Sequence, residues 1–133
     1  MKATVAVVAS LLWAVGMARA QEVSVKSLPA SIIRTVPESG DTKVDASTTT
    51  QIKVTFSKEM RDGSWSWSQI SDETFPQMAG TPRYLDDKRT CVVDVKLQPN
   101  KTYVIWLNSE KYRNFKDATG KPAVPYLLVF QTK

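Results

Sequence analysis

The chain has 133 residues, with 18 Lys or Arg against 13 Asp or Glu, one Cys and no His. The lack of histidine excludes Ser-His-Asp and Cys-His nucleophiles and ordinary zinc sites, and a single cysteine excludes an intrachain disulfide. The net charge of +5 comes from basic residues scattered along the chain, so we expect no nucleic-acid-binding surface.

Residues 1–20 have the pattern of a secretory signal peptide. A basic start at Lys2 precedes an apolar run from Ala3 to Met17, and Ala18-Arg19-Ala20 supplies the A-x-A cleavage pattern. The run is shorter than the ~20 residues of a spanning helix, which favours cleavage over a membrane anchor. We therefore predict a mature chain that begins at Gln21, is exported to the periplasm or the extracellular space, and keeps no membrane span.

The mature chain has the length of one domain. Residues 21–31 are polar and mixed, which indicates a linker or a docked arm. Residues 32–133 contain short segments with period-2 alternation, separated by turn residues, and this pattern is typical of an all-β domain. We expect about seven strands, over residues 32–36, 51–57, 64–70, 84–85, 89–97, 102–108 and 126–132.

A turn signal joins two of these segments. Leu97, Pro99 and Tyr103 have the spacing L-x-P-x-x-x-Y. In two-sheet β-sandwiches this spacing is typical of a tyrosine corner, in which the Tyr hydroxyl bonds to backbone a few residues upstream. It predicts that one strand ends at Leu97 and that Tyr103 opens the next.

Four stretches, in the same order, resemble a known family. The stretch VPESGDTKVDASTTTQIKVTFSKEM resembles the opening of bacterial Ig-like domains of the surface-layer-protein type, and LQPNKTYVIWL, KDATGKP and the terminal VFQT resemble later segments of that family. The resemblance covers residues 32–133 and implies an Ig-like Greek-key β-sandwich. It also implies a non-catalytic spacer or binding module of exported proteins. The SWSWS stretch and the long loop before the last strand depart from the family pattern.

No group of residues predicts catalysis, a metal site or a cofactor. Asp86 and Asp87 are adjacent carboxylates, but their place in a turn favours turn formation over acid–base catalysis. Aspartates in other loops leave calcium as an alternative, although the chain has no D-x-D-x-D-G loop. Cys91 alternates with apolar residues on one strand face, which predicts a buried thiol.

Two tryptophans share one face of the SWSWS stretch. Trp65 and Trp67 alternate with serines, which favours two rings in the core and the serines in water. The alternative is an exposed platform on which sugar rings stack. That alternative would make the chain a carbohydrate- or cell-wall-binding domain.

An apolar strip is expected on an outer sheet face. Alternation from Tyr103 places Val104 and Trp106 outside. The closing strand lies beside this strand in an Ig-type sheet, and the closing pattern of the family that the chain resembles implies that Leu127 and Val129 also face outward. Apolar patches of this kind usually mark partner sites on soluble proteins. We call this set the outer strip: Val104, Trp106, Leu127 and Val129.

Either the chain itself or a partner covers the outer strip. The first alternative uses the arm, residues 21–30, or the loop 109–125 with its aromatic side chains Tyr112 and Phe115. The second predicts an exported, non-catalytic binding or assembly module, with Tyr112 beside the strip. Its partner would be another protein or a second copy, and cell-wall polysaccharide is the alternative ligand.

Overall fold

The computed structural model describes residues 22–133, so the predicted signal peptide and its cleavage site lie outside the described residues. Within that range all regular elements are β-strands. The described residues contain no helix long and apolar enough to cross a membrane. The strands are β1 (Ile32–Val36), β2 (Gln51–Phe56), β3 (Trp67–Gln69), β4 (Gln77–Met78), β5 (Arg83–Tyr84), β6 (Thr90–Lys96), β7 (Thr102–Leu107) and β8 (Tyr126–Gln131). The all-β prediction is confirmed, and β4, too short for an alternation signal, is the strand the sequence did not predict.

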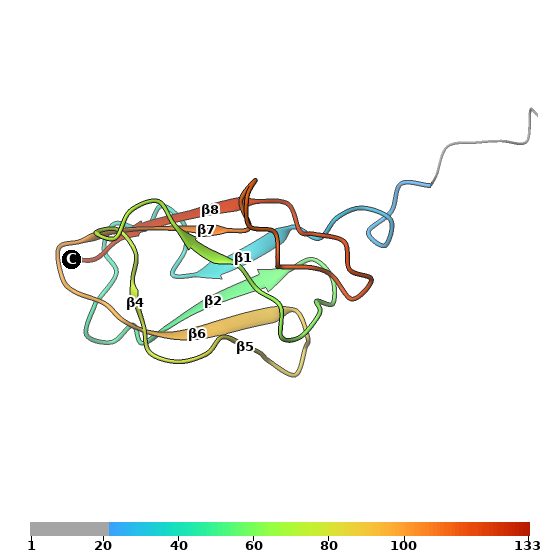
Figure 1. Cartoon of the computed structure of the whole chain (residues 1–133). Helices are drawn as coiled ribbons and strands as arrows, with labels where there is room; N and C mark the ends of the chain where they lie inside the picture. The colour runs from blue at the N-terminus through green and yellow to red at the C-terminus, as the bar shows by residue number, and fades with distance from the viewer. Residues whose placement is uncertain (1–21) are drawn as a thin grey trace, which may run out of the picture.

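The strands form two antiparallel sheets that face each other as two layers (Figure 1). The five-stranded sheet has the order β1-β2-β6-β4, with β5 also paired to β6. The three-stranded sheet has the order β3-β7-β8. In Figure 1 the arm leaves the sandwich at the end opposite the C-terminus.

The core lies between the sheets and uses the inward faces that alternation predicts. Ile52, Val54 and Phe56 of β2 are at most 1% exposed. Full burial of such a side chain contributes about 1.5–3 kcal/mol relative to exposure. The inward residues of β6, β7 and β8 are also buried: Cys91, Val93, Val95, Tyr103, Ile105, Leu107, Leu128 and Phe130. The predicted burial of the Cys91 thiol is confirmed.

Tyr103 links the end of β6 to the start of β7. Its ring is 1% exposed and its centroid lies 5.4 Å from that of Phe130. Its hydroxyl accepts a hydrogen bond of 2.8 Å from the backbone N–H of Gln98. Leu97 is half-buried against the core, and Pro99 is exposed in the turn. The hydroxyl therefore bonds to backbone a few residues upstream, which is the contact that the spacing predicts.

Candidate functional site

The outer strip runs across β7 and β8, on the face of their sheet that points away from the core. The strand register sets Val104 opposite Val129 and Trp106 opposite Leu127. Side chains that oppose each other on antiparallel strands contact one another. Leu127 is 38% exposed, Trp106 and Val129 are half-buried, and Val104 is buried. The strip is therefore apolar and partly open to water.

The long loop before β8, residues 109–125, carries two aromatic residues in different environments; we call it the closing loop. The suggestion that Phe115 covers the outer strip is wrong, because Phe115 is 0% exposed and belongs to the core. Its ring centroid lies 5.1 Å from that of Phe56 on the opposite sheet. Tyr112, by contrast, is 49% exposed in the first turn of the loop. Only Tyr112 of this pair is available to a partner.

Tyr112 and Trp106 line a pocket of about 540 Å³, which we call the outer pocket. The rest of its wall comes from Pro125, from Ser109, Glu110 and Lys111 of the closing loop, and from the edge-strand residues Ser68 and Gln69. The turn that carries Tyr112 is closed by its own backbone, since Ser109 N–H donates to Tyr112 O at 2.9 Å. The pocket therefore joins the outer strip, the closing loop and β3 in one place.

Asn108 holds the closing loop against the sandwich. Its side chain is 0% exposed, and its Nδ2 donates to Phe115 O at 2.9 Å and to Ala123 O at 3.0 Å. Its Oδ1 accepts from Phe115 N–H at 2.9 Å. Alternation along β7 predicts an outward Asn108 and is wrong here, because a backbone φ of 59° turns the chain just after the strand. One buried amide thus bonds both halves of the loop.

Two serines of the SWSWS stretch also bind the closing loop rather than water. Ser66 is 6% exposed, and its Oγ accepts from Asn114 N–H at 2.9 Å. The Oγ of Ser64 donates to the carbonyl of Asn114. The prediction that these serines face solvent is therefore wrong for Ser66. Their bonds fix the loop beside the start of β3.

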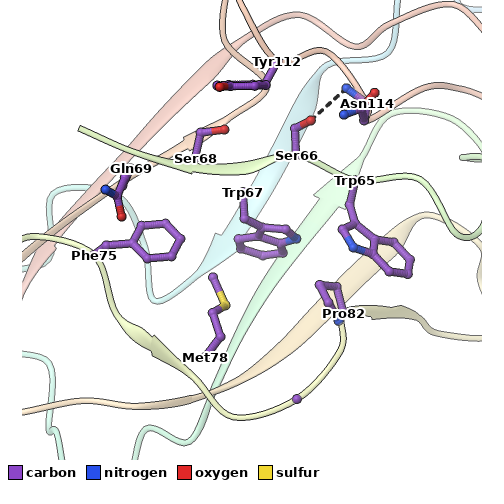
Figure 2. Close-up of a pocket in the computed structure, with 11 residues that line it drawn as sticks. Trp65, Ser66, Trp67, Ser68, Gln69, Phe75, Met78, Pro82, Tyr112 and Asn114 are labelled. Carbon is purple, nitrogen blue, oxygen red and sulfur yellow. Dashed lines mark hydrogen bonds between the residues drawn. The ribbon is translucent and has the colours of Figure 1, made fainter. Parts of the chain in front are cut away.

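Trp65 and Trp67 line a second cavity, of about 590 Å³, between the edges of the two sheets. We call it the inner groove. Figure 2 shows Trp67, Phe75 and Met78 on one side of β3 and Tyr112 on the other. The predicted strand 64–70 is shorter in the structure, and Trp65 precedes it. Both tryptophans are half-buried and pack against the core, which favours a packing role over a sugar platform.

Trp67 lines this groove and lies beside the core residue Cys91. The Trp67 ring packs edge-on against Phe115, with centroids 5.7 Å apart. Its Nε1 is buried and has no hydrogen-bond partner within residues 22–133. Burial raises the pKa of the Cys91 thiol to about 12. The thiol is therefore protonated at neutral pH and is a poor nucleophile.

A buried ion pair ties the arm to the sandwich. Lys58 Nζ lies 2.9 Å from Asp117 Oδ2, and the Asp117 side chain is 0% exposed. The same ammonium donates to the carbonyls of Lys26 and Leu28, each at 3.0 Å. Lys121 adds a bond of 2.7 Å to Ser27 O. The arm is thus docked by lysines near the closing loop, and these bonds do not involve the outer strip.

Asp117 also shapes the turn that follows it. Its Oδ1 accepts from the N–H groups of Thr119 at 2.9 Å and Lys121 at 3.0 Å. Burial raises the pKa of this carboxyl, but the hydrogen bonds from Lys58 and Thr119 outweigh it and hold the pKa well below its usual range. Gly120 in this turn has a φ of +93°, and a Cβ there would lie 2.8 Å from Arg61 Nη2.

Asp87, one of the adjacent carboxylates considered for acid–base catalysis, is held in its turn by hydrogen bonds. Within residues 22–133 no three His, Cys, Asp or Glu side chains come together as a metal site. Asp87 caps its own turn, since its Oδ1 accepts from Arg89 N–H and Thr90 N–H, both at 2.9 Å. Its bonds to Thr90 hold the pKa of Asp87 below its usual value. Asp87 is thus a structural turn residue.

The chain matches one protein family and resembles solved structures of the same fold. The chain matches the family model described as Bacterial Ig-like domain over residues 26–132. It is similar to the crystal structure of the S-layer protein rSbsC(31-844), at 19% identity and a TM-score of 0.51, with 80% of this chain and 14% of that chain covered. It is also similar to the N-terminal part of the bacterial S-layer protein SbsC, at 19% identity and a TM-score of 0.53, with 81% and 24% covered.

These two structures establish a common fold, and this chain spans a quarter or less of either one. No curated protein matches the chain. The family model, in contrast, covers nearly all of the described residues and includes every strand of both sheets. The chain therefore belongs to the bacterial Ig-like domain family.

Proposed function

We propose that this chain is an exported, non-catalytic module that binds a protein partner through the outer strip and Tyr112. The observation that supports it most directly is the outer pocket, where the half-buried Trp106 meets the exposed Tyr112 on an open sheet face. Exposed aromatic residues above an apolar strip are the usual anchors of protein interfaces. The S-layer proteins of similar fold are components of surface layers by name, which agrees with an exported assembly role.

Burial of the strip would supply enough free energy for specific binding. A Trp-centred patch of about 300 Å² contributes on the order of 7 kcal/mol at ~25 cal/mol per Å², before the entropy cost of association. Trp106 and Leu127 oppose each other in the register, so a partner side chain that packs over the pair contacts both. We therefore expect these two residues to dominate the binding energy.

The test is binding of the labelled protein to cell envelopes of the bacterium that encodes it. The double variant Trp106→Ser/Leu127→Ser should bind at least tenfold more weakly than the wild type. The matched control Ile33→Ser/Val36→Ser removes two apolar residues that are 59% and 43% exposed on β1, and it should bind normally. Near-ultraviolet circular dichroism checks that each variant is folded.

The nature of the ligand follows from treatment of the envelopes. Trypsin should abolish binding if the partner is a protein, whereas a muramidase should leave it intact. The reverse result would indicate cell-wall polysaccharide instead. Equal binding by the wild type and by Trp106→Ser/Leu127→Ser would show that the outer strip is not the working surface.

A further inference from the structure

The two edges of the three-stranded sheet differ in their neighbours. Along β8 the chain returns in residues 39–44, where Gly40 N–H donates to Val129 O at 2.6 Å and Gln131 N–H donates to Asp41 O at 2.8 Å. At the other edge, β3 is the last strand of its sheet within the described residues. An edge strand of this kind presents free backbone donors and acceptors to another chain.

The hydrogen-bond alternation shows which groups are free. Asn108 N–H donates to Ser66 O, and the register sets Ser68 opposite Trp106. In an antiparallel ladder, residues two apart point their backbone groups the same way. Ser66 and Ser68 therefore bond to β7, whereas the N–H and C=O groups of Trp67 and Gln69 point away from it. These free groups lie between the inner groove and the outer pocket.

We propose that β3 pairs antiparallel with β3 of a second copy, about a two-fold axis at Ser68. Trp67 of each copy then lies opposite Gln69 of the other, and each pair exchanges two backbone hydrogen bonds. The arrangement is self-complementary, since the free groups occur at two positions placed symmetrically about Ser68. This is the requirement of an interface with two-fold symmetry.

The charges at the two ends of β3 also favour a second copy as the partner, paired in the antiparallel direction. Arg113 lies next to Asn114, which is bonded to Ser66 at the start of the strand, and Arg113 is exposed. Asp72 and Glu73 are exposed just after the end of the strand. Antiparallel pairing brings the basic end of one copy against the acidic end of the other. Parallel pairing would place like charges together.

This pairing goes beyond the proposed function, because it does not require the outer strip to bind anything. It would join two three-stranded sheets into one continuous sheet. The outer strips of both copies would then lie on the same face. A partner that recognises one strip would meet two of them, which raises the effective affinity without a new contact.

Disulfide trapping tests the two-fold axis directly. Ser68 would face Ser68 of the second copy in a non-hydrogen-bonded pair, with Cα atoms about 4.5 Å apart, a separation that a disulfide can bridge. Ser68→Cys should therefore give a covalent dimer under mild oxidation. The matched control Ser71→Cys is more exposed, but it would face residue 65 of the second copy and should give at least tenfold less dimer. The buried Cys91 does not compete in either variant.

Variants with exchanged charges test whether the strands pair antiparallel, with self-association in solution measured by sedimentation. Arg113→Glu should weaken self-association at least fivefold, and the triple variant Arg113→Glu/Asp72→Arg/Glu73→Arg should restore it. Amide exchange supplies a second measurement that needs no substitution. As the protein concentration rises, the amides of Trp67 and Gln69 should become protected, while that of Ser68, already bonded to β7, should not change.

Three outcomes would overturn the pairing. One is equal disulfide yield from Ser68→Cys and Ser71→Cys, and another is no dimer from Ser68→Cys at any concentration. The third is a monomeric protein in which Ser68→Cys crosslinks to a foreign polypeptide, which would place a different protein on this edge. Failure of the proposed function is distinguishable, because Ser68→Cys/Trp106→Ser should still form the covalent dimer.

Discussion

The closing loop and the β3 edge are neighbours, joined by the hydrogen bond between Ser66 and Asn114. They differ in whether their polar groups have hydrogen-bond partners inside the protein. In the loop, Asn108 uses both donors and its acceptor on backbone partners inside the protein. At the edge, the backbone groups of Trp67 and Gln69 have no neighbouring strand on their open side among residues 22–133. The first arrangement fixes the fold, and the second leaves bonding capacity for another chain. Substitutions in the two regions should therefore change different measured quantities.

The largest expected effect is that of Asn108→Ala. The change leaves the N–H of Phe115 and the C=O of Ala123 without partners, at about 1–3 kcal/mol for each unsatisfied group, whereas Phe115 O still accepts from Ala123 N–H. We expect the free energy of unfolding to fall by about 3–5 kcal/mol in chemical denaturation. Asn100→Ala is the matched control, since Asn100 also has a positive φ, of 55°, but is exposed. Equal losses in both variants would assign the effect to backbone strain alone.

The second effect concerns the buried pair of Lys58 and Asp117. Lys58→Met leaves a buried carboxylate without its cation, which costs about 3–5 kcal/mol near pH 7. The pKa of Asp117 is lowered in the folded protein, so its stabilisation is complete above the unfolded pKa of about 4 and is lost as the pH falls toward the folded value. The stability difference between wild type and Lys58→Met should therefore shrink below about pH 4.

Lys88→Met is the control for this pH dependence. Its ammonium lies 3.8 Å from Glu59 Oε1 in an exposed ion pair, and such pairs contribute about 0–1 kcal/mol. Denaturation curves collected from pH 7 to pH 3 should show little difference between Lys88→Met and wild type. A constant gap for Lys58→Met over the same range would contradict the role given to Asp117.

These polar contacts mark the limit of what the sequence predicts. Alternation identifies the long strands and the burial of Cys91, because a strand face repeats every two residues and needs only local information. It fails at Asn108, since a single positive φ reverses the direction in which the side chain points. It gives no sign that Lys58 pairs with Asp117, because the two residues are distant in sequence and meet only in the folded chain.

The candidate site shows the same division. Alternation together with the Ig-type strand order predicts that the residues of the outer strip meet across two neighbouring strands, and the register of β7 and β8 places them opposite each other. It misplaces Phe115, because an irregular loop has no period from which a side-chain direction follows. The sequence also does not predict that β3 lies at the edge of its sheet, because the order of strands depends on the whole fold and not on any one strand. Of the residues that line the inner groove, only Trp65 and Trp67 are singled out by the sequence pattern.

A smaller effect is expected for Tyr103→Phe. The variant keeps the ring against Phe130 but leaves the N–H of Gln98 without its acceptor. We expect a loss of about 1–3 kcal/mol in the free energy of unfolding, with no change of fold. Tyr112→Phe removes a hydroxyl from an exposed ring and should leave stability unchanged. An unaltered denaturation midpoint for Tyr103→Phe would exclude a stabilising corner.

The smallest effect on the folded monomer is expected at the open edge, for Ser68→Lys. Ser68 is half-buried opposite Trp106, and a lysine stem can lie along that ring while its ammonium reaches water. The unfolding free energy at low protein concentration should therefore stay within about 0.5 kcal/mol of wild type. In the paired form, however, the two ammonium groups would face each other across the two-fold axis, and like charges directly opposite each other on paired strands are destabilising.

The melting temperature of wild type should rise with protein concentration, because association with a second copy stabilises the folded state by mass action. That of Ser68→Lys should not rise, whereas the control Thr42→Lys, at an exposed position beside the opposite edge of the sheet, should behave as wild type. If all three proteins melt at one temperature across a hundredfold range of concentration, the β3 edge does not bind a second copy, and the difference between the two regions is one of stability alone.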